Sequence, residues 1–444
     1  MSNNSNEPRR LFPRGLIALA VATMLERCGY FMVLSSLVMF IHGGLWFSSS
    51  DIWTIYLLGA ATMSILGGLL GDVAGHRRIA IAGGALTAGA LMLFSFPLEV
   101  LGESAFVPVL IILFVLASGR GMFPINVPAL AASLYDGRRS RVPLAGGLIV
   151  LQTGVALGAL LGTFFAEGIR FLGENLFDLS WEGSFHLAAG TAGHFALGAM
   201  VVLLARRGPL SAAENEVRDA IRAGRRSSDF AGAARQSARA LPFLIPGWAL
   251  FMLGYNLSYG SAHGFTSLFC GERIGWLWSI GSVSTVLLAP LAVLLVCLVV
   301  RSRERITHTS LAAAGMLAAA AAVAVLLVGS LLAAGPVSDA APSWHSEASS
   351  LAWPIGAVLL LGVADLVAVP LFHAFVLAAG PRRVRGLMLG LTIAAVGHFA
   401  FLDRFFYDWL EVIPFSWRTA SVCAGLLLAA LLVFAVGRAH RRPQ

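Results

Sequence analysis

The sequence has 444 residues, of which 58% are hydrophobic and only 12% are charged. A globular domain is usually about 25% charged and about 45–50% apolar, so a water-soluble fold is excluded and a lipid bilayer is the expected solvent. The formal net charge of +8 comes from arginine alone among the basic side chains, since the chain has no lysine. Because these arginines cluster between apolar runs, we interpret them as topology signals and not as a nucleic-acid-binding surface.

Twelve apolar stretches are long enough to cross a bilayer, which takes about 20 residues. They are rich in glycine and alanine, which let membrane helices approach each other closely. We therefore predict an all-α membrane protein with twelve spans near 14–41, 51–71, 77–97, 105–134, 142–166, 184–205, 240–263, 275–300, 307–334, 352–380, 385–407 and 415–437.

The arginine distribution predicts the orientation of these spans. Twenty-five arginines lie in the termini and in the even-numbered loops, against four in the odd-numbered loops. Since arginine is enriched on the cytoplasmic side, both termini are expected in the cytoplasm of a multi-pass protein of the bacterial inner membrane. The long polar stretch 206–239 divides the spans into six and six. The predicted parts are a cytoplasmic N-terminus 1–13, a bundle 14–205, a cytoplasmic linker 206–239, a bundle 240–437 and a cytoplasmic C-terminus 438–444.

Four ionisable residues are expected at bilayer depth: Glu26 and Arg27 in the first span, Arg120 in the fourth and Asp365 in the tenth. A charge there costs several kcal/mol unless it is paired or hydrated, which makes each one a functional hypothesis. Structural ion pairs are the alternative interpretation, but four charges spread over both halves favour a polar cavity. Adjacent helix positions point about 100° apart. We therefore expect Glu26 and Arg27 to face partners on other helices, with Glu26 as the partner of Arg120.

The segment GGLLGDVAGHRR, residues 67–78, resembles the signature that follows the second span in the major facilitator superfamily. This resemblance implies a fold of two six-helix bundles that alternately open to the two sides of the membrane. It also implies a cytoplasmic latch, in which glycines allow close helix packing and an aspartate braces the opposite bundle. The residues at matching positions are Gly68, Asp72, Gly75, Arg77 and Arg78.

A narrower resemblance covers four regions without a gap. FPRGLIALAVATMLERCGY (12–30), GRGMFPINVPALAASLYD (119–136), ALGALLG (156–162) and DLVAVPLFHAFVLAAGPRRVRGLMLG (365–390) are similar to spans one, four, five and ten to eleven of the proton-dependent oligopeptide transporters. The resemblance implies that Arg27 holds the carboxylate of a peptide and that Asp365 faces its amino group. Arg120 lies one turn before the position where the family has a lysine that also holds the carboxylate, so we expect Arg120 to supply that charge. It further implies Tyr30, Asn126 and Gln152 as substrate-binding residues, and Glu26 and Asp365 as proton-coupling residues.

Two departures from that family affect the coupling chemistry. Thr23 stands where the family has its first glutamate, and Pro124 stands where it has a lysine. Two hypotheses follow. The first is a proton-coupled transporter of small peptides or related zwitterions. The alternative is a transport-inactive protein of the same fold, acting as a structural or regulatory subunit of a larger membrane assembly.

The sequence shows no residue pattern typical of a catalytic site, such as an activated nucleophile or a phosphate-binding loop. Its four cysteines, Cys28, Cys270, Cys297 and Cys423, have no metal-ligand spacing. We therefore expect neither catalytic residues, nor a metal, nor a cofactor. The expected partners are a small-molecule or peptide substrate, protons and membrane lipid, with no nucleic acid.

Overall fold

The computed structural model of the chain describes residues 11–41, 49–136, 140–206, 208–212, 214–215, 245–259, 261–262, 265–266, 270, 277–301, 308–333, 350–379, 382–395 and 414–439. Most of the expected linker lies outside these residues, as do the first ten residues and the last five.

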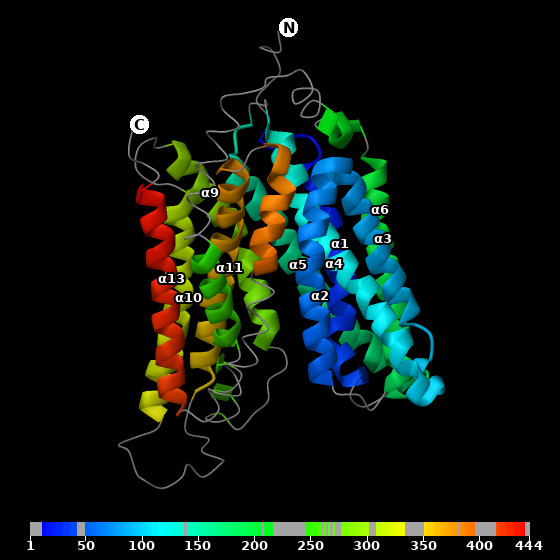
Figure 1. Cartoon of the computed structure of the whole chain (residues 1–444). Coiled ribbons are helices and arrows are strands. Elements are labelled where there is room, and N and C mark those ends of the chain that lie inside the picture. Colours follow the sequence, from blue (N-terminus) through cyan, green and yellow to red (C-terminus); the bar gives the residue numbers. More distant parts are fainter. Residues whose placement is uncertain are drawn as a thin grey trace.

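The first half of the chain forms six long helices. They are α1 (Leu16–Met39), α2 (Ser49–Ala74), α3 (His76–Leu93), α4 (Phe106–Tyr135), α5 (Leu144–Leu176) and α6 (Trp181–Ala205), with a short 3-10 segment η3 (Leu98–Ala105) before α4. Helix α1 packs on α5 and α6, while α4 packs on α2 and α3 (Figure 1). Small residues make these contacts possible. A Cβ on Gly29, for example, would overlap the backbone of Ala192.

The second half contains a helical segment 245–259, then α9 (Leu277–Arg301), α10 (His308–Ala333) and α11 (Ala352–Ala379). The short η4 (Arg382–Val384) leads into a helical segment 385–395, and α13 (Phe415–Ala439) follows. Nine of the described helices are long and apolar enough to cross a membrane. Each predicted span overlaps one helical region of the described residues, and among these residues the predicted all-helical membrane fold is confirmed.

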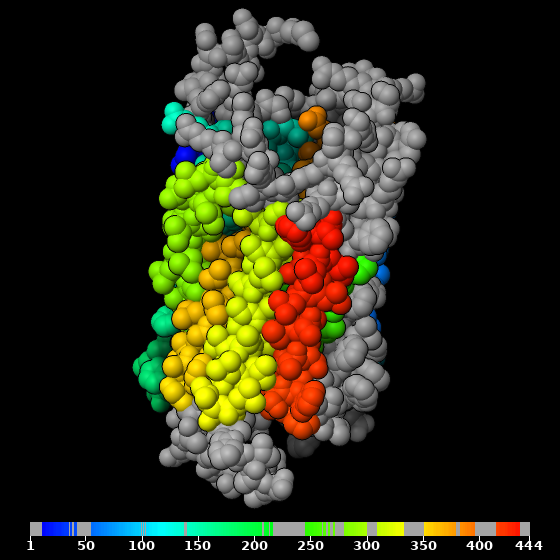
Figure 2. All heavy atoms as spheres, turned by 90° about the vertical axis from the view of Figure 1, so that its left-hand side faces the viewer, coloured from blue at the N-terminus to red at the C-terminus, as the bar shows by residue number. Residues whose placement is uncertain are grey.

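The outer surface of the second half is suited to lipid. Helices α10 and α13 run side by side over the face seen in Figure 2. Large apolar side chains are exposed there and on α9, including Leu287, Leu332 and Leu431. Exposed apolar side chains of this kind are stable in hydrocarbon, whereas in water they would drive association.

The two halves meet near one end of the molecule. The contacts between them run from α5 to α9 and α11, and from α2 to η4. One apolar core joins Leu16 and Ile149 of the first half to Met316 and Leu371 of the second. A second core, around Phe40, lies among the helices of the first half alone. Since Leu16 begins α1 and Ile149 lies in the second turn of α5, the joined end is the one expected in the cytoplasm.

Candidate functional site

Helix α1 carries a buried ion pair between neighbouring residues. Arg27 Nε lies 3.1 Å from Glu26 Oε2, and both side chains are almost completely buried. The expectation that the two would face separate partners was wrong. The arginine side chain is long enough to fold back across the roughly 100° between adjacent helix positions. Glu26 therefore has its compensating charge within its own helix.

Arg120 lies over an aromatic ring. Its guanidinium carbon is 4.0 Å from the centroid of Tyr30, and the Tyr30 hydroxyl accepts a 3.0 Å hydrogen bond from Tyr56. Among the described residues no carboxylate lies within ion-pair distance of Arg120, so the expected pairing with Glu26 was wrong. Arg120 Nη1 is buried and donates no hydrogen bond to any described residue. A guanidinium that contacts only the face of an aromatic ring keeps its N–H groups available to bind another acceptor.

Asp365 of α11 is held by the other half of the molecule. Gln152 Nε2, on α5, donates a 2.6 Å hydrogen bond to Asp365 Oδ2. Tyr255 and Tyr259 lie within electrostatic range of the same carboxylate. Both belong to the helical segment 245–259, and their hydroxyls are 3.5 Å apart. Sequence reasoning missed these tyrosines, although their spacing of four residues places them on one helix face.

The basic cluster and Asp365 lie at different levels along α5. Gly158 of α5 packs directly on the Cβ of Arg27, whereas Gln152 contacts Asp365. Their separation of six positions corresponds to about 9 Å along the helix at 1.5 Å per residue. Since α5 begins at the end where the halves meet, Asp365 is the group nearer to that end.

The predicted latch lies where α2 meets the segment 385–395. Asp72 accepts hydrogen bonds from the backbone N–H groups of Gly386 (2.9 Å) and Leu387 (2.8 Å). These are among the first N–H groups of a helix, which have no partner in their own helix and favour a negative charge. A Cβ on Gly68 would overlap the backbone of Gly386, and one on Gly386 would overlap Gly68. The two glycines therefore permit the crossing that brings Asp72 to the opposite half.

A second ion pair closes the same end. Arg385 donates to both oxygens of Asp136, at 2.6 and 3.3 Å, and its Nε donates to the carbonyl of Leu377. Arg382 lies 3.5 Å from Asp136. Asp136 belongs to the first half and both arginines to the second. Sequence reasoning had assigned these arginines to membrane topology alone, and a bidentate pair cannot be told from a topology charge without coordinates.

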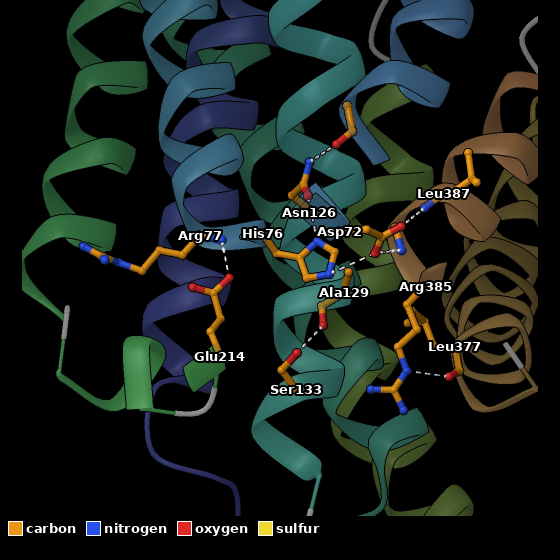
Figure 3. Close-up of polar contacts among 12 residues, drawn as sticks. Asp72, His76, Arg77, Asn126, Ala129, Ser133, Glu214, Leu377, Arg385 and Leu387 are labelled. Carbon is orange, nitrogen blue, oxygen red and sulfur yellow. Dashed lines mark hydrogen bonds and ion pairs between the residues drawn. The ribbon is translucent and has the colours of Figure 1, made fainter. Parts of the chain in front are cut away.

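Asn126 belongs to this cluster at the end where the halves meet and not to the central polar residues (Figure 3). Its Nδ2 donates to the carbonyls of Gly67 (3.0 Å) and Met122 (2.7 Å). Its Oδ1 lies 2.8 Å from Nδ1 of His76. The structure thus separates Asn126 from Tyr30, Arg120 and Gln152, with which the sequence had grouped it.

The remaining latch residues serve the first half itself. Gly75 has a φ of 105°, a conformation that favours glycine, at the turn between α2 and α3. Arg77 binds the start of the linker, since its backbone N–H donates to Glu214 and its Nη1 donates to Ser211. Arg78 is exposed. Of the predicted latch residues, Gly68 and Asp72 make the contacts between halves.

Comparisons with known proteins agree on the fold. A sequence model described as Major Facilitator Superfamily matches residues 19–402. A solved POT family transporter in complex with 5-aminolevulinic acid has 15% sequence identity and a TM-score of 0.68, over 97% of each chain. The peptide transporter POT in complex with sulfate has 20% identity and a TM-score of 0.63, over 98% of this chain and 97% of that one.

The fold comparison does not select a cargo. The proton:xylose symporter XylE, bound to 6-bromo-6-deoxy-D-glucose, has 14% identity and a TM-score of 0.68 over 95% of both chains. This TM-score equals that of the first POT family structure. A search of curated protein sequences returned no match. The chemistry of the central side chains must therefore decide between classes of cargo.

Proposed function

Because the chain belongs to the Major Facilitator Superfamily, we propose that it is a secondary active transporter of the peptide transporter type in a bacterial inner membrane. Its cargo is a small peptide or a related zwitterion, and protons drive the uptake. The family and the fold are those of a transporter and not of an enzyme.

The observation that carries this proposal is the buried Nη1 of Arg120, which donates no hydrogen bond to a described residue. A buried, unsatisfied charged donor is costly, and natural proteins retain such a group mainly where it has a role. Arg120 shares the ring of Tyr30 with Arg27, whose guanidinium carbon is 5.8 Å from its centroid. A cargo carboxylate placed between the two arginines would satisfy both. Asp365, on the other half, offers the opposite charge to an amino group.

Proton coupling follows from the ion pair on α1. Glu26 is fully buried, and the only charge that compensates it among the described residues is Arg27. If Arg27 turns to the cargo carboxylate, Glu26 is left as an uncompensated buried anion, which costs several kcal/mol. Binding a proton removes that cost. Cargo and proton therefore bind together, and each favours the binding of the other.

Alternating access requires that contacts between the halves break and re-form. The two halves are joined by the contacts of Asp72, by the Arg385–Asp136 pair and by the Gln152–Asp365 hydrogen bond. Asp365 is thus both a proposed cargo ligand and a link between halves. A cargo amino group that replaces Gln152 at Asp365 would weaken this link and promote opening.

One observation favours the transport-inactive alternative. Thr23 stands in place of a coupling glutamate, and its hydroxyl donates to the carbonyl of Leu19 in its own helix. Pro124 lies inside α4 and has no ionisable group. A structural subunit would tolerate both replacements, whereas a transporter must rely on Glu26 and Arg120 instead.

Uptake into proteoliposomes with an imposed inward proton gradient distinguishes the two functions. We expect accumulation of di- or tripeptides by the wild type. We expect Glu26→Gln to lose accumulation while keeping counterflow, because an amide preserves the shape of the side chain but carries no titratable proton. Asp365→Asn should weaken cargo binding.

Glu167→Gln is the matched control, because it removes an exposed carboxylate on α5 that lies in a surface ion pair with Arg170. It should transport like the wild type. If the folded wild type accumulates no peptide and no other zwitterion under the gradient, the transporter proposal fails and the subunit function is favoured.

A further inference from the structure

The cytoplasmic cluster contains a histidine that the transport mechanism above does not use. His76 begins α3 and lies between Asn126 of α4 and Asp72 of α2 (Figure 3). His76 and Asn126 are both buried. The Cα of Gly71 faces both of them, and a Cβ there would overlap the Asn126 amide. The ring is therefore fixed in place by three helices.

Hydrogen bonding determines which ring nitrogen carries a proton. Both donor positions of the Asn126 amide are used, since Nδ2 donates to the carbonyls of Gly67 and Met122. The orientation of the amide is therefore set, and Oδ1 is the atom that faces His76 Nδ1 at 2.8 Å. An amide oxygen only accepts. Nδ1 of His76 must be the donor, so it carries a hydrogen.

This assignment leaves Nε2 of His76 opposite a carboxylate. Nε2 lies 3.5 Å from Asp72 Oδ1, and that oxygen already accepts from the N–H of Gly386. With hydrogen on Nδ1, a neutral ring presents a lone pair at Nε2. Two acceptors then face each other in a buried site, which is unfavourable. One proton between Nε2 and Oδ1 turns the contact into an attractive one.

The other charged groups around Asp72 and His76 already have partners of their own. Arg385 lies within electrostatic range of both Asp72 and His76, but its guanidinium is bound to Asp136, as Arg382 also is. Arg77 points away from the pair toward Ser211 and the carbonyl of Leu203, and its backbone N–H binds Glu214. Arginine does not deprotonate. The titratable proton of this cluster therefore belongs to Asp72 and His76.

We propose that Asp72 and His76 form a second proton-binding site, at the cytoplasmic latch, whose single proton must leave to the cytoplasm when the latch opens. The site lies outside the central polar cluster and requires no cargo. In the closed state a proton on Nε2 makes the contact with Oδ1 an ion pair. In the open state the carboxylate and the ring are hydrated, and above about pH 6.5 a hydrated histidine is neutral.

The sign of the pH dependence follows. Because the proposed proton is bound in the closed state and leaves in the open state, raising the pH favours the open state. For one proton, the ratio of open to closed molecules rises by up to about tenfold per pH unit. Opening toward the cytoplasm is therefore promoted by an alkaline cytoplasm, which is also the condition that favours release of a co-transported proton.

A distance measurement tests this site without transport. Spin labels at Val73→Cys on α2 and Phe434→Cys on α13, both exposed positions, report the separation of the halves in proteoliposomes after replacement of the native cysteines by alanine. Between about pH 5 and pH 8, where histidine titrates, we expect the open fraction of the wild-type chain to rise with pH. Each of the variants His76→Gln and Asp72→Asn should lose this dependence, because each removes one of the two groups whose contact holds the proton in the closed state.

His194→Gln is the control, because His194 is an exposed histidine of α6 whose ring contacts the carbonyl of Gly190. It should keep the wild-type dependence. An open fraction that does not change with pH in the wild type, or a His76→Gln chain with the wild-type dependence, overturns the proposal. The inference rests on alternating access but not on a cargo. A chain that transports without pH-dependent opening would refute this site alone, and pH-dependent opening without uptake would refute the proposed transport function alone.

Discussion

Glu26 and Arg27 leave α1 in different directions, yet the arginine folds back to pair with the acid beside it. The sequence identified both residues because charges are rare in apolar spans. It did not identify their pairing, because backbone geometry fixes where a side chain begins and not where a flexible one ends. The same limit applies to Arg120, whose neighbour is the ring of Tyr30 and not a carboxylate.

The buried pair predicts a stability effect at the residue scale. Arg27→Ala leaves Glu26 without compensation, and breaking a buried pair in this way costs about 3–5 kcal/mol. We expect a lower unfolding temperature in detergent, together with loss of both accumulation and counterflow.

The double variant Glu26→Gln/Arg27→Met separates the two effects, because it removes both charges and leaves no buried ion. It should recover most of the unfolding temperature but none of the coupled transport. A double variant as unstable as Arg27→Ala would show that Arg27 contributes through packing and not through charge.

At the scale of elements, α2 and the segment 385–395 pack closely because each has a glycine at the point of contact. The sequence predicted Gly68 and Asp72 as latch residues from a short motif, and the structure places both against Gly386. It did not predict Asn126 or His76 there. Asn126 lies on α4 six positions after Arg120, which was assigned to the cavity, and only the crossing of α4 with α2 brings it to Gly67. Contacts between helices distant in the sequence leave no local pattern.

The glycine crossing predicts a conformational effect. A methyl group on Gly68 would meet the backbone of Gly386, so Gly68→Ala should disfavour the closed cytoplasmic end. The spin-label pair described above should report a larger open fraction than in the wild type at the same pH.

Gly89→Ala on α3 is the matched control, since nothing lies within 4 Å of a Cβ at that position. There the substitution should stabilise the helix by roughly 0.5–1 kcal/mol and leave the open fraction unchanged. Equal open fractions for the two variants would contradict a steric role of the crossing.

At the scale of the whole molecule, hydropathy and arginine bias were sufficient to predict the helical membrane fold, because the bilayer constrains span length and loop charge directly. Which end of the molecule is closed was not predictable. That depends on contacts between α5, α9 and α11 and on the Arg385–Asp136 pair. Such contacts exist in one state of a two-state protein, and one sequence encodes both states.

The distance along α5 between the contacts of Arg27 and Asp365 sets the length of a cargo that can reach both. The α5 residues that contact Arg27 and Asp365, Gly158 and Gln152, lie six positions or about 9 Å apart along the helix, and an extended peptide spans about 3.3–3.6 Å per residue. A solute that touches both groups must therefore carry its opposite charges two to three residues apart. We expect dipeptides and tripeptides to compete for uptake more strongly than a free amino acid, whose charges share one carbon. Competition for uptake by glycine oligomers of increasing length would measure which cargo length binds best. Equal competition by free glycine would show that the cargo contacts either Arg27 or Asp365 but not both at once.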